Sequence, residues 1–161
     1  MEFEKLLDFL AIVLSAIAFL FSVLQFLAER KRCRKEATIH AFDQLETSED
    51  ILFLLKQKKE DIDPMVKEKE ANCNFENDAW KSLSRALPLI EHFAVGINTG
   101  IYDKVTLNRM AGNQIISTYL ACEELIKYKR TGWGKGKNYT EFEKMARDLR
   151  SYRKRRGQSI P

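Results

Sequence analysis

The most distinctive feature of the chain is an apolar run near its start. Between Phe9 and Ala28 the sequence has no charged residue and only three polar ones. A helix of this length rises about 30 Å, which matches the hydrocarbon core of a bilayer. A helix also satisfies its own backbone hydrogen bonds, for which hydrocarbon offers no partner. The pattern therefore predicts a transmembrane helix over residues 9–28.

Two other interpretations of this run are weaker. A buried core helix would need cover on all sides, and the rest of the chain is too small to supply it. A cleaved signal peptide has a shorter apolar stretch, of about 7–15 residues, after a basic flank. The flank here, MEFEK, is acidic. We therefore expect a membrane anchor that is retained.

The charges around the run predict its orientation. Residues 1–8 contain three acidic side chains and one basic one, whereas five of the six residues from 30 to 35 are basic. Because Lys and Arg concentrate on the cytoplasmic side, we expect a single-pass membrane protein with its C-terminal side in the cytosol. Residues 1–8 would be a short extracytoplasmic N-terminus, 29–36 a basic juxtamembrane segment and 37–161 a cytoplasmic α-helical domain. The expected lipid-headgroup contacts are Arg30, Lys31, Arg32, Arg34 and Lys35.

Small and polar residues form one stripe along the predicted span: Ala11, Ser15, Ala18, Ser22 and Gln25. Helices associate in hydrocarbon through close packing over small residues and through interhelical hydrogen bonds. The stripe predicts self-association of the membrane helix, and hence a homo-oligomer. The alternative is that both serines bond back to carbonyls of their own helix.

The remaining apolar positions recur at helical spacing. Steps of three and four run from Trp80 to Ile97 and predict one helix, which Pro88 should kink or restrict on its N-terminal side. Further helices are expected up to about Leu45, around 51–55, over 107–128 and over 142–152, whereas the charged stretch 56–76 reads as a loop. Inward-facing residues in the 107–128 helix would be Met110, Ile115, Tyr119, Cys122 and Ile126. No stretch alternates at period two, so the predicted fold is all-α: one transmembrane helix followed by a small cytoplasmic helical bundle.

Local signals mark several helix ends. Asn98-Thr99-Gly100 would stop one helix, with Gly100 at positive φ, while Gly96 would allow close packing and Asp103 would cap the next helix. We treat Gly96, Gly100 and Asp103 as a structural hinge. Thr140-Glu141-Phe142-Glu143 fits a capping box for the last helix.

Composition excludes most enzyme classes. Two His and three Cys, at 33, 73 and 122, leave little material for a metal or catalytic cluster, and the odd cysteine number suits reduced cytosolic thiols. Glu36 and His40 make only half a metal site. The Gly132–Lys137 loop lacks the spacing of a P-loop, and phosphate binding through Lys135 and Lys137 is a weaker alternative to a plain connector. A pocket at the Gly96–Gly100 bend, lined by Glu91, Tyr102 and Asp103, is a weaker alternative to the structural interpretation. We expect no enzymatic activity, no cofactor and no metal.

Basic residues also gather at the C-terminus, although the net charge of the chain is only +4. They can contact lipid or nucleic acid, or simply complement the negative end of a helix dipole. The residues concerned are Arg150, Arg153, Lys154, Arg155 and Arg156.

One segment resembles a known family. The stretch IEHFAVGINTGIYD, residues 90–103, is similar to the signature of the bacterial domain-of-unknown-function 4760 family. The resemblance implies an N-terminal membrane helix and a helical domain, and it implies no activity.

These observations together favour a membrane-anchored, non-catalytic interaction protein. We expect a self-associating membrane effector or scaffold in a bacterial defence or stress system, with the lipid bilayer and further copies of the chain as partners. The alternative is a membrane-tethered nucleic-acid-binding module that uses the C-terminal basic helix.

Overall fold

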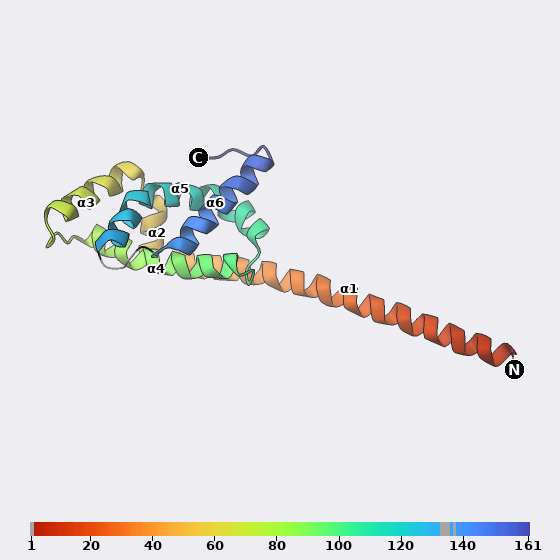
Figure 1. Cartoon of the computed structure of the whole chain (residues 1–161). Helices are drawn as coiled ribbons and strands as arrows, with labels where there is room; N and C mark the ends of the chain where they lie inside the picture. The colour runs from red at the N-terminus through yellow and green to blue at the C-terminus, as the bar shows by residue number, and fades with distance from the viewer. Residues whose placement is uncertain (1, 133–135, 137) are drawn as a thin grey trace. The chain divides into compact units, whose positions relative to one another are not determined.

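The chain begins with one long helix. A computed structural model describes residues 2–132, 136 and 138–161. Helix α1 (Glu2–Glu46) runs unbroken through the apolar stretch and the basic segment that follows it (Figure 1). Its sequence has neither Gly nor Pro, so nothing in it interrupts the backbone hydrogen bonds.

The chain divides into two compact units, residues 1–36 and 37–161. The second unit contains the end of α1 and five more helices: α2 (Glu49–Lys56), α3 (Lys59–Ala71), α4 (Asp78–Asn98), α5 (Lys104–Gly132) and α6 (Thr140–Arg155). All regular elements among the described residues are helices. The prediction of an all-α fold that starts with a candidate membrane span is confirmed.

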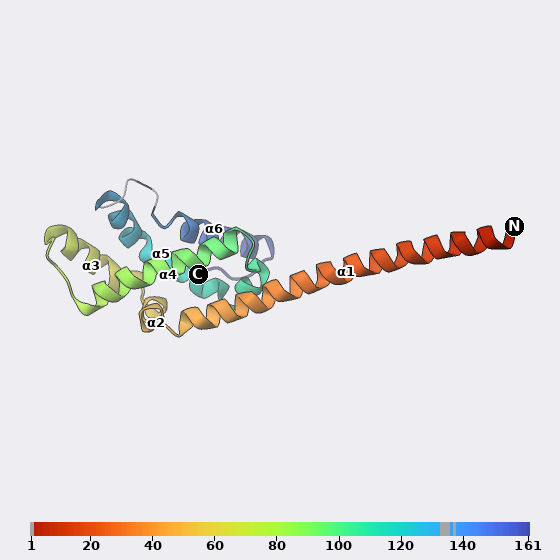
Figure 2. The same ribbon diagram turned by 90° about the horizontal axis from the view of Figure 1, so that it is seen from below.

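Helix α4 supplies much of the core of residues 37–161. It contacts α2 and α6, while α5 contacts α2, α3 and α6 (Figure 2). The predicted apolar face of α4 is buried, with Leu83, Leu87 and Ile90 fully enclosed. The part of α1 beyond residue 36 joins the same core, because the Phe42 ring lies 5.8 Å from the Phe93 ring, centroid to centroid.

The prediction of a loop over 56–76 is wrong, since α3 occupies residues 59–71. Two apolar residues four positions apart, Ile62 and Val66, are buried in a helix that packs on α5. Most of the other side chains of α3 are charged, which hid the helical pattern. Pro64 lies inside α3, and Pro88 lies inside α4, and both helices continue through them.

The irregular point is in α5 instead. Ala111 has φ −138° and ψ 17°, outside helical geometry, so α5 is kinked there. Met110, expected to face inward, is 41% exposed, because the kink breaks the helical phase that linked it to the later positions. Ile115, Cys122 and Ile126 are buried as predicted, and Tyr119 is half-buried.

Candidate functional site

The surface of residues 9–28 is the first candidate site. All large apolar side chains from Phe9 to Leu27 are exposed, Val13 least at 36% and Phe19 most at 69%. An apolar surface of this extent is not left in water by soluble proteins and marks a membrane or protein contact. An 18-residue stretch of α1 has a mean hydropathy of 2.5, so the helix is long and apolar enough to cross a bilayer.

Basic side chains follow this surface directly. All five predicted headgroup contacts between residues 30 and 35 are exposed. Arg32 pairs with Glu29 at 2.9 Å and with Glu36 at 3.5 Å. Glu36 therefore has a basic partner on its own helix, and no group of three or more metal-ligating side chains occurs among the described residues.

The two serines of the small-residue stripe bond within their own helix. Ser15 Oγ donates to the carbonyl of Ala11 at 2.8 Å, and Ser22 Oγ donates to that of Ala18 at 2.9 Å. This is the geometry of the alternative interpretation. Each hydroxyl oxygen can still accept a hydrogen bond from a neighbouring helix.

The turn between α4 and α5 has the structural roles expected of it. Gly100 has φ +77°, the left-handed region that glycine adopts without strain. The carboxylate of Asp103 accepts hydrogen bonds from the backbone N–H and the hydroxyl of Thr106, each at 2.8 Å, and so caps α5. The backbone N–H of Asp103 donates to Thr38 Oγ1 at 2.6 Å, which ties the turn to the end of α1.

Gly96 allows a close approach, although its partner is a ring in the turn rather than another helix. The Tyr102 ring occupies the space that a Cβ at position 96 would need. The backbone N–H of Tyr102 donates to the carbonyl of Gly96 at 3.0 Å, and its ring stacks on Phe93 with centroids 5.5 Å apart. The absent side chain of Gly96 thus lets the turn fold back on α4.

Glu91 has a role that the sequence interpretation missed. Its carboxylate accepts hydrogen bonds from the backbone N–H groups of Glu141, at 3.1 Å, and Phe142, at 2.7 Å. Seven residues later on α4, Asn98 Nδ2 donates to the carbonyl of Glu141 at 2.9 Å. Two side chains of α4 therefore hold the first turn of α6. The spacing of seven, which places both on one helix face, was the available signal.

This arrangement replaces the capping box predicted at Thr140. The N-cap residue is Tyr139, which has φ 62°, and its side chain makes no capping hydrogen bond. Glu91 supplies the carboxylate from another helix, where it also faces the positive end of the α6 dipole. Glu91 thus holds the first turn of α6, a role other than the pocket-lining one considered at the Gly96–Gly100 bend.

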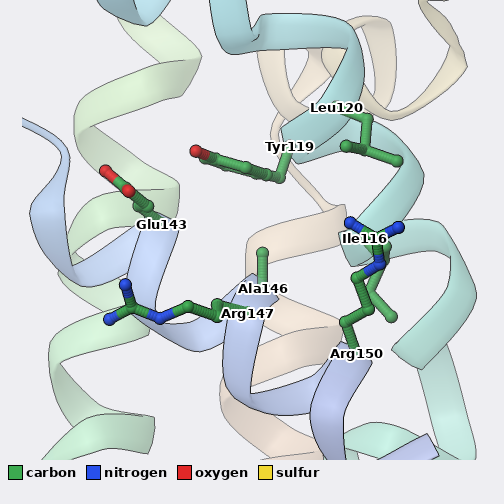
Figure 3. Close-up of a pocket in the computed structure, with 7 residues that line it drawn as sticks. All are labelled: Ile116, Tyr119, Leu120, Glu143, Ala146, Arg147 and Arg150. Atoms are coloured by element: carbon green, nitrogen blue, oxygen red, sulfur yellow. The ribbon is translucent and has the colours of Figure 1, made fainter. Parts of the chain in front are cut away.

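A cavity of about 190 Å³ lies between α5 and α6. Its floor is apolar, from Ile116, Leu120 and Ala146, and charged side chains of α6 stand around it (Figure 3). Glu143 also lines it and pairs with Arg130 at 2.8 Å. Burial, with the nearby Glu143 charge, raises the pKa of Tyr119 in the wall. An apolar floor beside Arg147 and Arg150 suits binding of an apolar group next to an anion.

The C-terminal basic residues differ in their surroundings. Arg153 donates to the carbonyl of Ser159 at 2.9 Å and to Asn108 Oδ1 at 3.3 Å. The Arg156 guanidinium lies 4.8 Å from the centre of the Tyr152 ring. Arg153 therefore holds the C-terminal segment, whereas Arg150, Lys154, Arg155 and Arg156 are exposed. The phosphate-binding interpretation of Lys135 and Lys137 falls on residues outside the described ones.

The fold and the apolar surface define a class: an all-α protein with one N-terminal helix suited to crossing a membrane. The chain matches the family model described as Domain of unknown function (DUF4760) over residues 10–149, and it belongs to that family. No curated protein and no solved structure matches the chain. The segment that carries the resemblance, residues 90–103, contains Glu91, Gly96, Gly100 and Asp103, all of which position helices.

Proposed function

We propose that this protein is a membrane-anchored, non-catalytic interaction protein. Residues 9–28 span the bacterial inner membrane, with the N-terminus outside and residues 37–161 in the cytosol. The observation that carries the proposal is the exposed apolar surface of residues 9–28, followed at once by exposed basic residues. Hydrocarbon buries the first and anionic headgroups attract the second, at about 1 kcal/mol per Lys or Arg.

In its specific form, several copies associate through their membrane helices and act as an effector or scaffold in a bacterial defence or stress system. The stripe from Ala11 to Gln25 supports association, because its small residues let two helices approach closely. The remainder of the span is mostly large and apolar, as lipid contact requires.

Overproduction of the full chain in bacteria tests the effector form. We expect growth arrest, abolished by Ile17→Asp, because a charge at the centre of the span costs about 3 kcal/mol on insertion. Ile101→Asp is the matched control, since this side chain is 61% exposed in the other unit, and the arrest should persist. If all three strains grow without arrest, the effector form is excluded and the scaffold form is favoured.

The nucleic-acid alternative rests on exposed Arg150, Lys154 and Arg155. Retention of the detergent-solubilised protein on immobilised DNA or RNA measures it. Binding that weakens steeply with salt, and more so in a triple Gln variant of these residues, would favour the alternative.

A further inference from the structure

A cavity of about 460 Å³ lies where the end of α3, the first half of α4 and the C-terminal part of α5 meet. This volume lies in the range of pockets for small organic ligands. Three lysines line the cavity, Lys69, Lys81 and Lys129, against one acidic residue, Glu76. The cavity therefore has a positive charge balance that a bound anion would neutralise.

Two of these lysines share one indole ring. The Nζ of Lys129 lies 5.0 Å from the centre of the Trp80 ring, and that of Lys69 lies 5.9 Å from it. Lys129 is half-buried, and its burial together with the charge of Lys69 lowers its pKa. Trp80 is 4% exposed, so both ammonium groups are held over a buried aromatic face.

No acidic side chain offsets this pair within the described part of the chain. There, no carboxylate oxygen lies within 4.0 Å of the ammonium group of Lys69, Lys81 or Lys129. Glu76, which also lines the cavity, is exposed. Within the described residues, the positive charges are therefore in place without a carboxylate counterion in contact.

After the hydrogen bonds within the protein are counted, Lys129 still has protons to donate to a bound oxyanion. Lys69 donates to the carbonyls of Cys73, at 2.6 Å, and Phe75, at 2.7 Å. Lys129 donates to Ser84 Oγ at 3.1 Å, and an ammonium group has three protons to donate. Ser84 accepts this bond, so its own hydroxyl can donate a hydrogen bond to a bound oxygen.

Aromatic side chains form the other wall. Tyr128 lies edge-on to Trp80, with ring centroids 5.6 Å apart, and Tyr139 also lines the cavity. Such walls favour an organic group attached to the anion. A phosphate monoester carries between one and two negative charges near pH 7, which matches two adjacent ammonium groups better than a carboxylate does.

We propose that this cavity binds an organic phosphate, with the phosphate on Lys129 and Ser84 and the organic group against Tyr128 and Tyr139. Binding does not require that α1 spans a membrane. The phosphate belongs either to a soluble metabolite or to a lipid headgroup, and the two sources are distinguished by separate probes.

The experiment uses the full chain in detergent with Trp133→Phe, so that Trp80 is its only tryptophan. Phenyl phosphate is the soluble probe, dihexanoyl phosphatidic acid is the headgroup probe, and benzoate is the singly charged comparison. We expect a saturable change in Trp80 fluorescence and a higher melting temperature with a phosphate probe. Benzoate should bind at least tenfold more weakly.

Lys129→Gln should weaken phosphate binding at least tenfold, because it removes a charge-assisted hydrogen bond. Lys127→Gln is the matched control: it removes the same charge from the same helix, at an exposed side chain that pairs with Glu124 at 2.8 Å. Its affinity should change less than twofold. Ser84→Ala, a smaller change, should weaken binding about threefold and provides a second test if Lys129→Gln unfolds.

Response to phenyl phosphate alone assigns a soluble ligand, and response to phosphatidic acid alone assigns a headgroup. Response to both confirms the shared phosphate chemistry. The proposal would be overturned if neither phosphate probe gave a saturable response. It would also be overturned if Lys127→Gln and Lys129→Gln weakened phosphate binding equally.

Discussion

Glu91 caps a helix that begins about fifty residues later in the chain: its Oε2 accepts a 2.7 Å hydrogen bond from the backbone N–H of Phe142. The other carboxylate oxygen accepts from Glu141. Phe142 is fully buried against the core, so the cap fixes the point at which α6 enters the domain. Glu91, together with Asn98 on the same helix, thereby holds the first turn of the C-terminal helix in place.

Replacing Glu91 should therefore destabilise the domain and loosen α6 locally. Glu91→Ala leaves two N–H groups without their acceptor, and loss of an N-cap costs about 1–2 kcal/mol. Urea unfolding of the full chain in detergent measures the loss, and hydrogen exchange should be faster at the amides of Glu141 and Phe142. His92→Ala, at the exposed neighbouring position, should change stability by less than about 0.5 kcal/mol. Equal effects of the two substitutions would contradict the assigned cap.

Gly96→Ala should also destabilise the protein, although the higher helix propensity of alanine would favour the opposite result. Alanine in place of a helical glycine normally gains about 1 kcal/mol. Here the new Cβ would meet the Tyr102 ring, and overpacking costs about 1–3 kcal/mol. In a Tyr102→Ala background the clash is absent, so Gly96→Ala should become neutral or stabilising. A cost that persists in that background would place the strain elsewhere.

Sequence reasoning identified the helices whose apolar residues repeat, such as α4 with Leu83, Leu87 and Ile90. It failed for α3, where only Ile62 and Val66 are buried and most other positions are charged. A short helix that packs mainly on one neighbouring helix needs few apolar residues. Its amino-acid composition therefore resembles that of a loop. Tertiary contact with α5, rather than a repeating pattern, identifies it.

The candidate site shows the same limit. The positive φ of Gly100 and the cap at Asp103 are local, and short-range spacing predicted both. The cap from Glu91 is long-range, and a local alternative at Thr140 hid it. The cavity around Trp80 and Lys129 was not anticipated at all, because its walls come from residues about fifty positions apart in the chain.

The buried thiol of Cys122 predicts a loss of stability at alkaline pH. Burial raises its pKa from 9.0 to about 12, so the folded state keeps the proton where the unfolded state releases it. Its thiol therefore imposes no penalty below pH 9, and stability falls as the pH rises from 9 towards 12. At pH 10 the loss is about 1.4 kcal/mol. Cys122→Ala should lack this component of the pH dependence. Urea unfolding at pH 8 and pH 10 measures the change in the free energy of unfolding for each protein. The same change in the variant and in the wild type would contradict the burial of the thiol.

Labelling of thiols in intact cells checks the proposed orientation. Cys73 is exposed and Cys122 is buried, so Cys73 is the reporter for the helical domain. In a Cys33→Ser background we expect a membrane-impermeant thiol reagent to modify Cys73 only after lysis. Phe3→Cys, near the other end of α1, should be modified without lysis. Labelling of Cys73 in intact cells would reverse the assigned topology.

Self-association through the membrane helix predicts a dependence on side-chain size along one face. Larger residues at Ser15 and Ala18 would hold two helices apart, whereas Ile12 and Phe19 lie outside the stripe and would contact lipid. The double variant Ser15→Leu, Ala18→Leu should therefore shift a crosslinked ladder in membranes towards monomer. Ile12→Leu, Phe19→Leu is the matched control and should leave the ladder unchanged.

The hydrogen bonds of the serines sharpen this test. Because Ser15 Oγ already donates to Ala11, close packing rather than a serine donor would dominate the contact. Ser15→Ala keeps a small side chain and removes the hydroxyl, so its ladder should match that of the wild type. If Ser15→Ala shifts the ladder as far as the double leucine variant does, interhelical hydrogen bonding carries the association. If no variant shifts it, the copies associate through residues 37–161 instead.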